Sequence, residues 1–393
     1  MTDDSEKAVQ ERIGAKIREL RVAAGITAVE LARQAGLSQS QLSKIETGKA
    51  ALSIGALTSL CQILGRPLSY LFQKDEEIPR VLGTMTTVAG PESRGLAWFA
   101  NEVRIRTGGR LSLVPLQATL LGPQTRQSAM LKDGFLDLFI EDLPAFRDLA
   151  PALDLLSLPY IFESTEHQSA FLESAEFDQN IKQTLLNEGV RPINFRWNWQ
   201  RGIERVILST RPIIHPDQVR GLKVRIFESP LLARFWEELG AKPVVIPWPN
   251  LRRAWLKGEV DLLPTQKAHL YPLGFCRRGR YVTLIGDVPP QLMVAVNEAR
   301  YNCLPPSVQT ALIEACDAAG DFFSQEVIRA EAENEQANMR RYGATYLKVD
   351  IKPWQAASRK ITEKLVTQWP EARKMWETVC QMSGYRQGPL NPL

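Results

Sequence analysis

The sequence lacks a long apolar run and an export signal. No uninterrupted apolar stretch approaches the roughly 18 residues that a membrane-spanning helix needs. The first segment, MTDDSEKAVQERIGAKIREL, is acidic and polar and has neither an apolar signal core nor a cleavage-site pattern. We therefore expect no membrane partner and a cytoplasmic location.

Cysteine and histidine are sparse. The five cysteines are odd in number and scattered, as expected of reduced thiols. Three histidines, His167, His215 and His269, lie far apart and at no metal-ligand spacing to a cysteine. We expect no metal and no cofactor, and interpret the histidines as surface or hydrogen-bonded residues.

Signatures of catalysis are absent as well. There is no GxSxG elbow, no GxxxxGK[ST] phosphate loop and no HExxH pair. The pair Glu141-Asp142 could provide general acids or be ordinary loop carboxylates, and Glu141 is kept as a candidate ligand contact. No catalytic residues are assigned, and we expect that the chain is not an enzyme.

The length of 393 residues predicts two or three domains. Residues 9–72 carry helical patterns alone, and residues 73–80 are polar and charged and include a proline, as in a linker. Residues 81–393 alternate apolar strand-like runs with helical stretches. The net charge of +4 is mild, so a nucleic-acid-binding surface would have to be local.

Two capping boxes divide the first domain into short helices. Thr27 and Glu30 have the required spacing, and so do Ser38 and Gln41. Gly36 lies between the boxes, where a positive φ can redirect the chain. Two helices joined by such a turn form a helix-turn-helix. The buried side of the earlier helix is expected to hold four apolar residues: Val29, Leu31, Ala32 and Ala35.

The exposed side of the later helix is polar. Amide, hydroxyl and ammonium groups there could read base edges in a major groove, and Lys49 could contact a phosphate. A solvated polar helix face is the alternative that these residues leave open. The candidate base-reading residues are Gln39, Ser40, Ser43 and Lys44, with Gln41 partly turned away.

The first domain resembles the Cro and phage-repressor class of helix-turn-helix domains, the XRE family, through about sixty residues that include LSQSQLSKIETGK. The resemblance implies a recognition helix at residues 38–47, an internal salt bridge between Arg21 and Glu46, and a homodimer on double-stranded operator DNA. The family often has a phosphate-contacting glutamine where this chain has Ala28. Phosphate contacts then depend more on helix-terminal amides and on Thr27, Thr47 and Lys49.

The second domain is expected to have α/β architecture with a parallel sheet. Two further runs, at 193–199 and 205–209, could cross between two lobes. Residues 306–341 form one helical pattern broken only by Gly320, and residues 353–382 form a helical tail. The strand-like runs lie at 81–88, 111–116, 136–140, 222–226, 243–247, 260–263 and 281–285.

Arginines occur within apolar strand-like runs, among them Arg201, Arg205 and Arg225. Burying such a charge without a partner is costly, and a guanidinium can bind a ligand carboxylate with two parallel hydrogen bonds. An internal ion pair is the alternative, and the residues alone leave both open.

Residues 81 to about 350 resemble the periplasmic substrate-binding proteins of TRAP transporters, the dicarboxylate-binding (DctP) type. The segments LLGPQTRQSAMLKDGFLDL, LPYIF, RPIIHPDQVRGLKVRI and LGAKPVVIPWPNLRRAWLKGEVD carry the resemblance. It implies a two-lobed α/β domain that closes over a small organic acid.

The resemblance also implies site residues. Arg225 falls on the carboxylate-binding arginine, and Trp248 replaces a phenylalanine near the pocket. Glu204 stands where a second pocket arginine is often found. A second positive group on the ligand, or a changed register bringing Arg205 inward, would each fit this departure. Thr265 stands approximately where the family has an asparagine.

Together the two resemblances lead us to expect a ligand-responsive transcriptional regulator. One alternative is a DNA-binding repressor whose large domain only mediates oligomerisation, and another is an enzyme fused to a DNA-binding domain. The candidate ligand contacts are Arg225, Arg205, Arg201, Trp248, Thr265 and Glu141.

Overall fold

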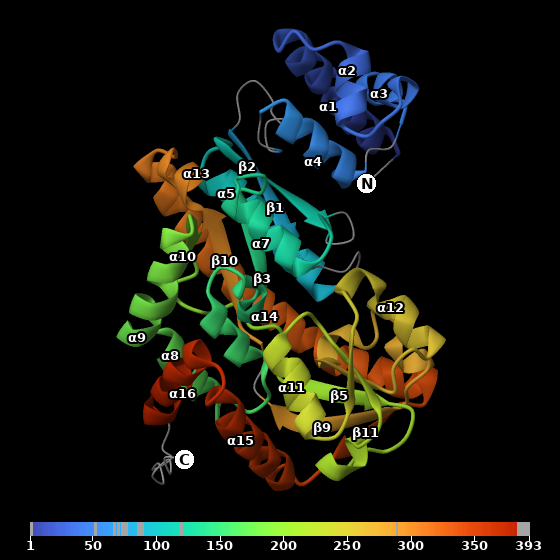
Figure 1. The fold of residues 1–393 in the computed structure, drawn as a ribbon, viewed down its shortest axis with the longest axis vertical. Coiled ribbons are helices and arrows are strands. Elements are labelled where there is room, and N and C mark those ends of the chain that lie inside the picture. The colour runs from blue at the N-terminus through green and yellow to red at the C-terminus, as the bar shows by residue number, and fades with distance from the viewer. Residues whose placement is uncertain are drawn as a thin grey trace.

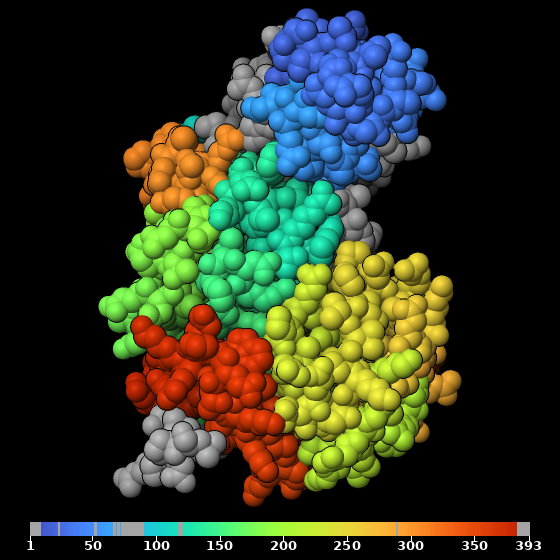
Figure 2. Space-filling view, viewed as in Figure 1, coloured from blue at the N-terminus to red at the C-terminus, as the bar shows by residue number. Residues whose placement is uncertain are grey.

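The computed structural model consists of a helical head and a larger domain that contains two sheets. The head and the larger domain lie at different ends of the molecule (Figure 1). In the space-filling view the head projects beyond the rest of the chain (Figure 2). The described residues are 3–50, 53–65, 68, 71, 78–84, 90–117, 121–287 and 290–382.

The head is built from short helices whose starts are set by side-chain caps. Thr27, Ser38 and Ser53 each accept a hydrogen bond from the amide three residues later. The capping box of Ser38 and Gln41 is complete. The helices are α1 (Asp3–Ala23), α2 (Ala28–Gln34), α3 (Gln39–Glu46) and α4 (Ile54–Ile63).

Two details of α2 differ from the prediction. Val29 was expected to be buried but is 56% exposed, whereas Leu31 and Ala32 are buried. The Glu30 carboxylate does not accept a hydrogen bond from the Thr27 amide, because it binds the side chains of Arg33 and Gln34 on the next turn. The first capping box is therefore only half formed.

The first sheet begins earlier than expected. Strand β1 covers Ile78–Thr84, so three residues assigned to the linker 73–80 belong to the sheet. Pro79 lacks an amide donor, but its position near the start of the strand is one that a sheet tolerates. The expected strand at 81–88 extends past residue 84 into residues outside the described part.

The two sheets define two lobes. Both are mixed, in contrast to the parallel sheet that was expected, because β10 runs antiparallel to β3 and β4, and β5 runs antiparallel to β8 and β9. The first sheet has the order β2-β1-β3-β10-β4, and the second has the order β11-β9-β5-β8-β6-β7.

Helices flank both sheets. In the first lobe the elements are α5 (Pro91–Arg106), β2 (Leu111–Gln117), α7 (Gln124–Lys132), β3 (Leu138–Asp142), α8 (Thr165–Leu172), α9 (Ala175–Phe177), α10 (Gln183–Asn187), β4 (Val190–Pro192), β10 (Leu292–Asn297) and α13 (Glu298–Asn302). In the second they are β5 (Arg205–Ser209), β6 (Lys223–Ile226), α11 (Pro230–Glu238), β7 (Lys242–Val245), α12 (Trp248–Lys257), β8 (Leu262–Gln266), β9 (Tyr281–Asp287) and β11 (Thr345–Lys348).

Two chain segments and one helix connect the lobes. The segment from β4 to β5 crosses as irregular backbone, so the strand expected at 193–199 does not form, while residues 205–209 form β5. Gln200 pairs with Gln291 of the return crossing in an isolated bridge. The crossings therefore run side by side at one point.

The long helix α14 (Pro306–Tyr342) packs on α5 of the first lobe and on the short turns that follow β8 in the second. It continues through Gly320, where a break was expected. A Cβ on Gly320 would lie 2.3 Å from the Asn198 side-chain oxygen and 2.7 Å from the Trp199 ring. The glycine thus allows the helix to approach the crossing segment closely.

The last helices, α15 (Lys352–Val366) and α16 (Pro370–Met382), bridge both lobes. Helix α15 packs on α11 of the second lobe, and α16 packs on α8 and on residues 151–157 of the first. The expected helical tail is therefore two helices. None of the helices in the described ranges combines the length and the apolar character needed to cross a bilayer.

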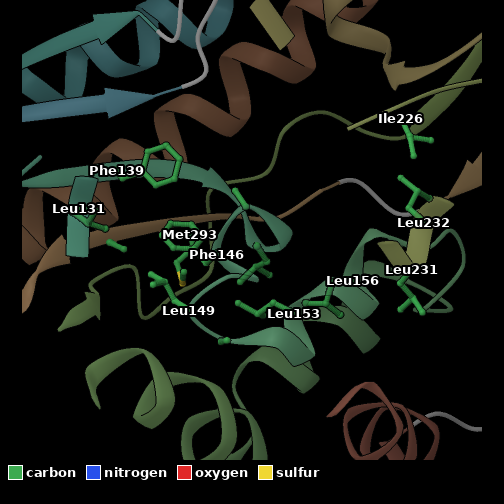
Figure 3. Close-up of a cluster of buried hydrophobic side chains, with 14 of the residues drawn as sticks. Leu131, Phe139, Phe146, Leu149, Leu153, Leu156, Ile226, Leu231, Leu232 and Met293 are labelled. Atoms are coloured by element: carbon green, nitrogen blue, oxygen red, sulfur yellow. The ribbon is translucent and has the colours of Figure 1, made fainter. Parts of the chain in front are cut away.

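A buried apolar cluster continues from the first lobe into the second (Figure 3). It runs from Phe139 and Met293 in the first sheet, through Phe146 and Leu153, to Leu231 at the start of α11. Residues 143–157 thus form a shared core between the lobes, and the cleft described below lies where they meet.

Candidate functional site

The head presents the predicted DNA-contacting residues on one exposed surface. Leu42 and Ile45 turn α3 toward the core, which leaves its polar face free. The exposed residues are Thr27, Gln39, Ser40, Gln41, Ser43, Lys44, Thr47 and Lys49.

Hydrogen bonds within the head already engage some of these side chains, so the residues differ in the donors and acceptors that remain for DNA. Gln41 accepts from the Ser38 amide with its side-chain oxygen (2.8 Å), so that oxygen is engaged in the capping box. The Thr47 hydroxyl donates to the Ser43 carbonyl (2.9 Å), which uses the proton that a phosphate would need. Among the described residues the Thr27 hydroxyl accepts from the Glu30 amide and donates to no group, so its proton is available to a phosphate. Gln41 and Thr47 are therefore weaker candidates than Thr27.

The predicted ion pair between Arg21 and Glu46 is present. The guanidinium donates to both carboxylate oxygens, at 2.6 and 3.0 Å, and the two side chains are only 13% and 8% exposed. Hydrogen bonding to Glu46 raises the pKa of Arg21, which keeps the arginine charged. This pair fixes α1 against the end of the recognition helix.

The second candidate site is a cleft with about 1060 Å³ of empty space, including its open mouth. It lies where β3, β6 and β8 end, and where β5 begins beside the end of β9. Ligands of α/β proteins commonly bind outside the carboxyl ends of such strands. All six predicted ligand residues line this cleft: Glu141, Arg201, Arg205, Arg225, Trp248 and Thr265.

Arg225 has no neutralising partner in the part of the chain that the structure describes. Its side chain is 9% exposed, and Nε donates to the Ile246 carbonyl (3.1 Å). Burial lowers its pKa to about 10, while Asp142 and Glu141 act in the opposite direction from a distance. The guanidinium is therefore charged at neutral pH, and its remaining N–H donors are available to an anion in the cleft.

Arg201 was predicted as a ligand contact, but the structure pairs it internally. It donates to Glu141 and lies 3.2 Å from both Glu92 and Asp142. Burial lowers the Arg201 pKa, but the three carboxylates outweigh burial and raise it overall. Arg201 lines the cleft as part of this buried cluster and is already neutralised.

Glu141 belongs to the same cluster. Burial raises its pKa to about 7, even though Arg201 lowers it, whereas the pKa of Glu92 is lowered overall by Arg201 and His269 in spite of burial. One guanidinium cannot neutralise three carboxylates, and the opposite pKa shifts mean that Glu141 keeps a proton more readily than Glu92 does. Its Oε2 atom is buried and has no hydrogen-bond partner among the described residues.

Arg205 turns into the cleft, and Glu204 does not line it. Arg205 begins β5, and alternate residues of this strand, Arg205 and Ile207, face the cleft. A register irregularity against β9 follows Arg205 directly. The arginine donates to the Ser157 carbonyl (3.3 Å) and lies 3.9 Å from Asp287, so it retains donors for a ligand.

Trp248 and Thr265 are placed by the ends of β7 and β8, which lie on either side of β6 in the sheet. Trp248 starts α12 and packs against the His269 ring with centroids 4.8 Å apart. Thr265 is 4% exposed at the end of β8. His269 itself bonds Glu92 (2.6 Å), as a hydrogen-bonded histidine was expected to do.

Several lining residues were missed from the sequence. Tyr160 has φ of 57°, and donates its amide to Asp287 (2.9 Å) and its hydroxyl to the Ile285 carbonyl. This backbone conformation is unfavourable unless the surroundings fix it. Nothing in LPYIF signals it. The apolar spacing of α11, in contrast, was a readable signal of a buried face: Leu232, Phe235, Trp236 and Leu239 all line the cleft.

Hydrogen bonds join the lobes across the cleft. Thr125 donates to Glu228 (3.0 Å), the Leu231 amide donates to Asp154 (3.1 Å), and the Ser157 and Ser229 hydroxyls lie 3.0 Å apart. The structure therefore shows the lobes in contact at residues 228–231, the segment that follows β6 and Arg225.

Comparison with known proteins identifies both parts of the chain. The family model of bacterial extracellular solute-binding proteins, family 7, matches residues 82–368, well over half of the chain. A helix-turn-helix domain model matches residues 12–69. The 2,3-diketo-L-gulonate-binding periplasmic protein of Escherichia coli is 24% identical over 224 residues, which cover 57% of this chain and 67% of that protein. A solute-binding protein of Roseobacter denitrificans is 26% identical over 262 residues, which cover 66% and 78%.

Solved structures share the two-lobed fold. A TRAP periplasmic solute-binding protein of Roseobacter denitrificans with bound β-D-glucuronate has a TM-score of 0.69 at 22% identity, covering 77% of this chain and 98% of that chain. A Sulfitobacter protein with bound β-D-galacturonate has a TM-score of 0.70 at 21% identity, covering 77% and 99%. The chain belongs to the family 7 extracellular solute-binding proteins and carries a helix-turn-helix domain ahead of that fold.

Proposed function

We propose that this chain is a ligand-responsive transcriptional regulator, which binds operator DNA through α3 and senses a small organic acid in the cleft. One observation carries the proposal. The chain that presents an exposed polar recognition helix also holds a buried arginine, Arg225, whose donors face a cleft without a partner carboxylate in the described residues. The acids bound by structural relatives, glucuronate and galacturonate, support the carboxylate as the recognised group.

The proposed signal is closure of the lobes. A carboxylate bound to Arg225 of the second lobe favours the arrangement in which bonds such as Thr125 to Glu228 are made. Closure then changes the spacing or freedom of two heads in a homodimer. A coupling free energy of about 1–3 kcal/mol between the acid and DNA would change operator affinity by about 5- to 150-fold.

Binding to operator DNA also leads us to propose an oligomeric state and a location. Helix-turn-helix dimers bind half-sites about one helical turn apart, so we infer a homodimer on a two-fold operator. Binding to chromosomal DNA implies a place in the cytoplasm. Light scattering of the full chain with and without operator tests the dimer, and a monomer on a single half-site would contradict it.

The DNA-binding function is tested first. An operator is selected from genomic fragments with the full chain, and its affinity is compared with that of unrelated DNA. The double substitution Gln39→Ala with Lys44→Ala is expected to weaken operator binding by at least tenfold more than non-specific binding, because it removes base-edge contacts. Arg18→Ala, on an exposed position of α1, is the matched control. An equal loss on both DNAs would contradict base reading by α3.

Coupling is tested next. The acid that shifts the melting temperature of the chain is added to the operator complex, and the same titration is made with Arg225→Ala. The proposal expects operator affinity to change only in the unsubstituted chain. Unchanged operator affinity at a saturating acid concentration would favour the alternative, a repressor whose large domain only mediates oligomerisation. The unpaired Arg225 speaks against that alternative.

A further inference from the structure

We propose that the acid recognised by the cleft carries an apolar, ring-sized body in place of a row of hydroxyl groups. This inference rests on the proposed function, because it specifies the ligand of the same cleft. It is carried by the side chains beyond Arg225 and by the hydrogen bonds that the polar lining residues have already made.

One wall of the cleft is an apolar helix face. Leu232, Phe235, Trp236 and Leu239 follow the spacing i, i+3, i+4 and i+7 along α11 and its end, and each is no more than 9% exposed. Seven residues of helix rise by about 10 Å. This wall is therefore long enough to lie along an aromatic ring and a short linker.

The opposite side of this region is apolar as well. Trp354 of α15, which packs on α11, lines the cleft and is 4% exposed. Ile226 from β6 and Ile285 from β9 also line it. Ile226 directly follows Arg225, so the guanidinium and the apolar walls meet at the end of one strand.

The polar side chains at the cleft are mostly occupied. Ser157 donates to the Asp154 carbonyl (2.6 Å), Tyr160 donates to the Ile285 carbonyl, and His269 is bonded to Glu92. Among the lining side chains of the described residues, Glu141 Oε2 and His269 Nδ1, both at the Arg201 cluster, are buried without a hydrogen-bond partner, and so is the indole Nε1 of Trp354. The free polar atoms therefore gather near the arginines and the Arg201 cluster, while the α11 side of the cleft offers a ligand apolar surface and, among the described residues, one indole N–H.

This distribution discriminates between classes of acid. A sugar acid brings several hydroxyl groups into the cleft, and each one that finds no partner lowers affinity by roughly tenfold. An aryl-substituted acid instead buries its ring against α11 and Trp354 and makes the same carboxylate contact with Arg225. A very small acid fills only the end of the cleft beside Arg225.

The experiment is calorimetric titration of the full chain with three acids: 3-phenylpropionate, D-glucuronate and pyruvate. We expect 3-phenylpropionate to bind at least roughly tenfold more tightly than either of the others. Methyl 3-phenylpropionate has the same body without the carboxylate charge, and it should bind at least roughly tenfold more weakly than the acid.

A variant locates the body in the cleft. Leu239→Gln places an amide at the far end of the α11 wall and should weaken 3-phenylpropionate by roughly tenfold, while Leu239→Met, which keeps an apolar side chain of similar volume, should change affinity less than about threefold. The comparison of acids on the unsubstituted chain decides the question if Leu239→Gln does not fold.

The outcomes separate this inference from the proposed function. Equal or tighter binding of D-glucuronate or pyruvate overturns the apolar class, while loss of that binding in Arg225→Ala would leave acid sensing intact. Binding of none of the three acids overturns the inference and counts against acid sensing itself.

Discussion

Two buried arginines line the same cleft, and their surroundings differ completely. Arg201, on the crossing segment, is surrounded by Glu92, Glu141 and Asp142. Arg225, on β6, bonds a backbone carbonyl and forms no ion pair in the described residues. The first arginine is neutralised by carboxylates of the protein itself, and the second has no such partner among the described residues.

This difference shows how one residue type serves two roles in one fold. A buried charge with partners stabilises the arrangement of its neighbours, whereas a buried charge without partners is costly until a ligand neutralises it. The Arg201 cluster joins the crossing segment to α5 and β3. Arg225 instead leaves guanidinium N–H donors at the cleft, where we propose that they bind an acid. Substitutions of these arginines and of their neighbours test whether Arg201 serves stability and Arg225 serves ligand binding.

The largest effect is expected from Arg201→Ala. Removing the cation takes the guanidinium partner away from the buried carboxyl groups of Glu92 and Glu141 and from the partly exposed one of Asp142, which should lower the free energy of unfolding by about 3–5 kcal/mol. Urea unfolding of the full chain, followed by the fluorescence of its tryptophans, measures the loss. Arg225→Ala is the matched control, because it removes a buried cation that has no partner and should not lower stability comparably. Equal destabilisation by Arg201→Ala and Arg225→Ala would contradict the distinction between a paired and an unpaired buried arginine.

The second effect concerns affinity. Arg225→Ala should weaken binding of the recognised acid by at least roughly a hundredfold, because the carboxylate loses charged donors in a buried site. Arg225→Lys retains the charge but not the planar fork, and we expect an intermediate affinity. Calorimetric titration of the three chains gives the order. Binding in Arg225→Ala that is as tight as in the unsubstituted chain would exclude this arginine from the site.

The third effect is on pH dependence. The folded pKa of Glu141, about 7, lies above its ordinary value of 4.5, so the carboxyl group favours folding most when it is protonated. Its contribution is fully present below about pH 4.5 and is lost as pH rises through 7. Glu141→Gln should remove this loss and raise stability at pH 8 by an amount on the order of 2 kcal/mol. Melting temperatures at pH 5 and pH 8 measure it, and an unchanged slope in the variant would contradict the assignment.

The smallest effect is expected from Arg205→Ala. This side chain is 20% exposed, bonds the Ser157 carbonyl and lies 3.9 Å from Asp287, so it contributes less than Arg225 to an anion in the cleft. Acid affinity should fall by only a few-fold. A loss as large as that of Arg225→Ala would show that both arginines hold the carboxylate.

The sequence predicted much of this architecture, and its failures have physical causes. The capped helices of the head and the strands that begin at Leu111, Lys223 and Tyr281 lie close to where their patterns placed them. Strand β10 was missed because all six of its residues are buried, and a continuous apolar run has no period that separates strand from helix. Strand β11 was missed because it is four residues long and pairs with β9, 64 positions earlier.

The candidate site shows the same limit more sharply. All six predicted ligand residues line one cleft, yet the sequence could not separate Arg201 from Arg225. The deciding partners, Glu92 and Glu141, are 109 and 60 residues away from Arg201. Local patterns predict that an arginine is buried, but only the topology shows which carboxylates reach it.

Strand β1 has a consequence for how a signal can leave this protein. It is the first described strand after the head, and it is held on both sides, by β2 over seven residue pairs and by β3 over three. The chain of the head therefore continues into an interior strand, which cannot be displaced without breaking the hydrogen bonds of the sheet. In the proposed closure the second lobe moves relative to that attachment, so we expect the effector to act on two heads in a dimer through contacts between the second lobe and the neighbouring copy.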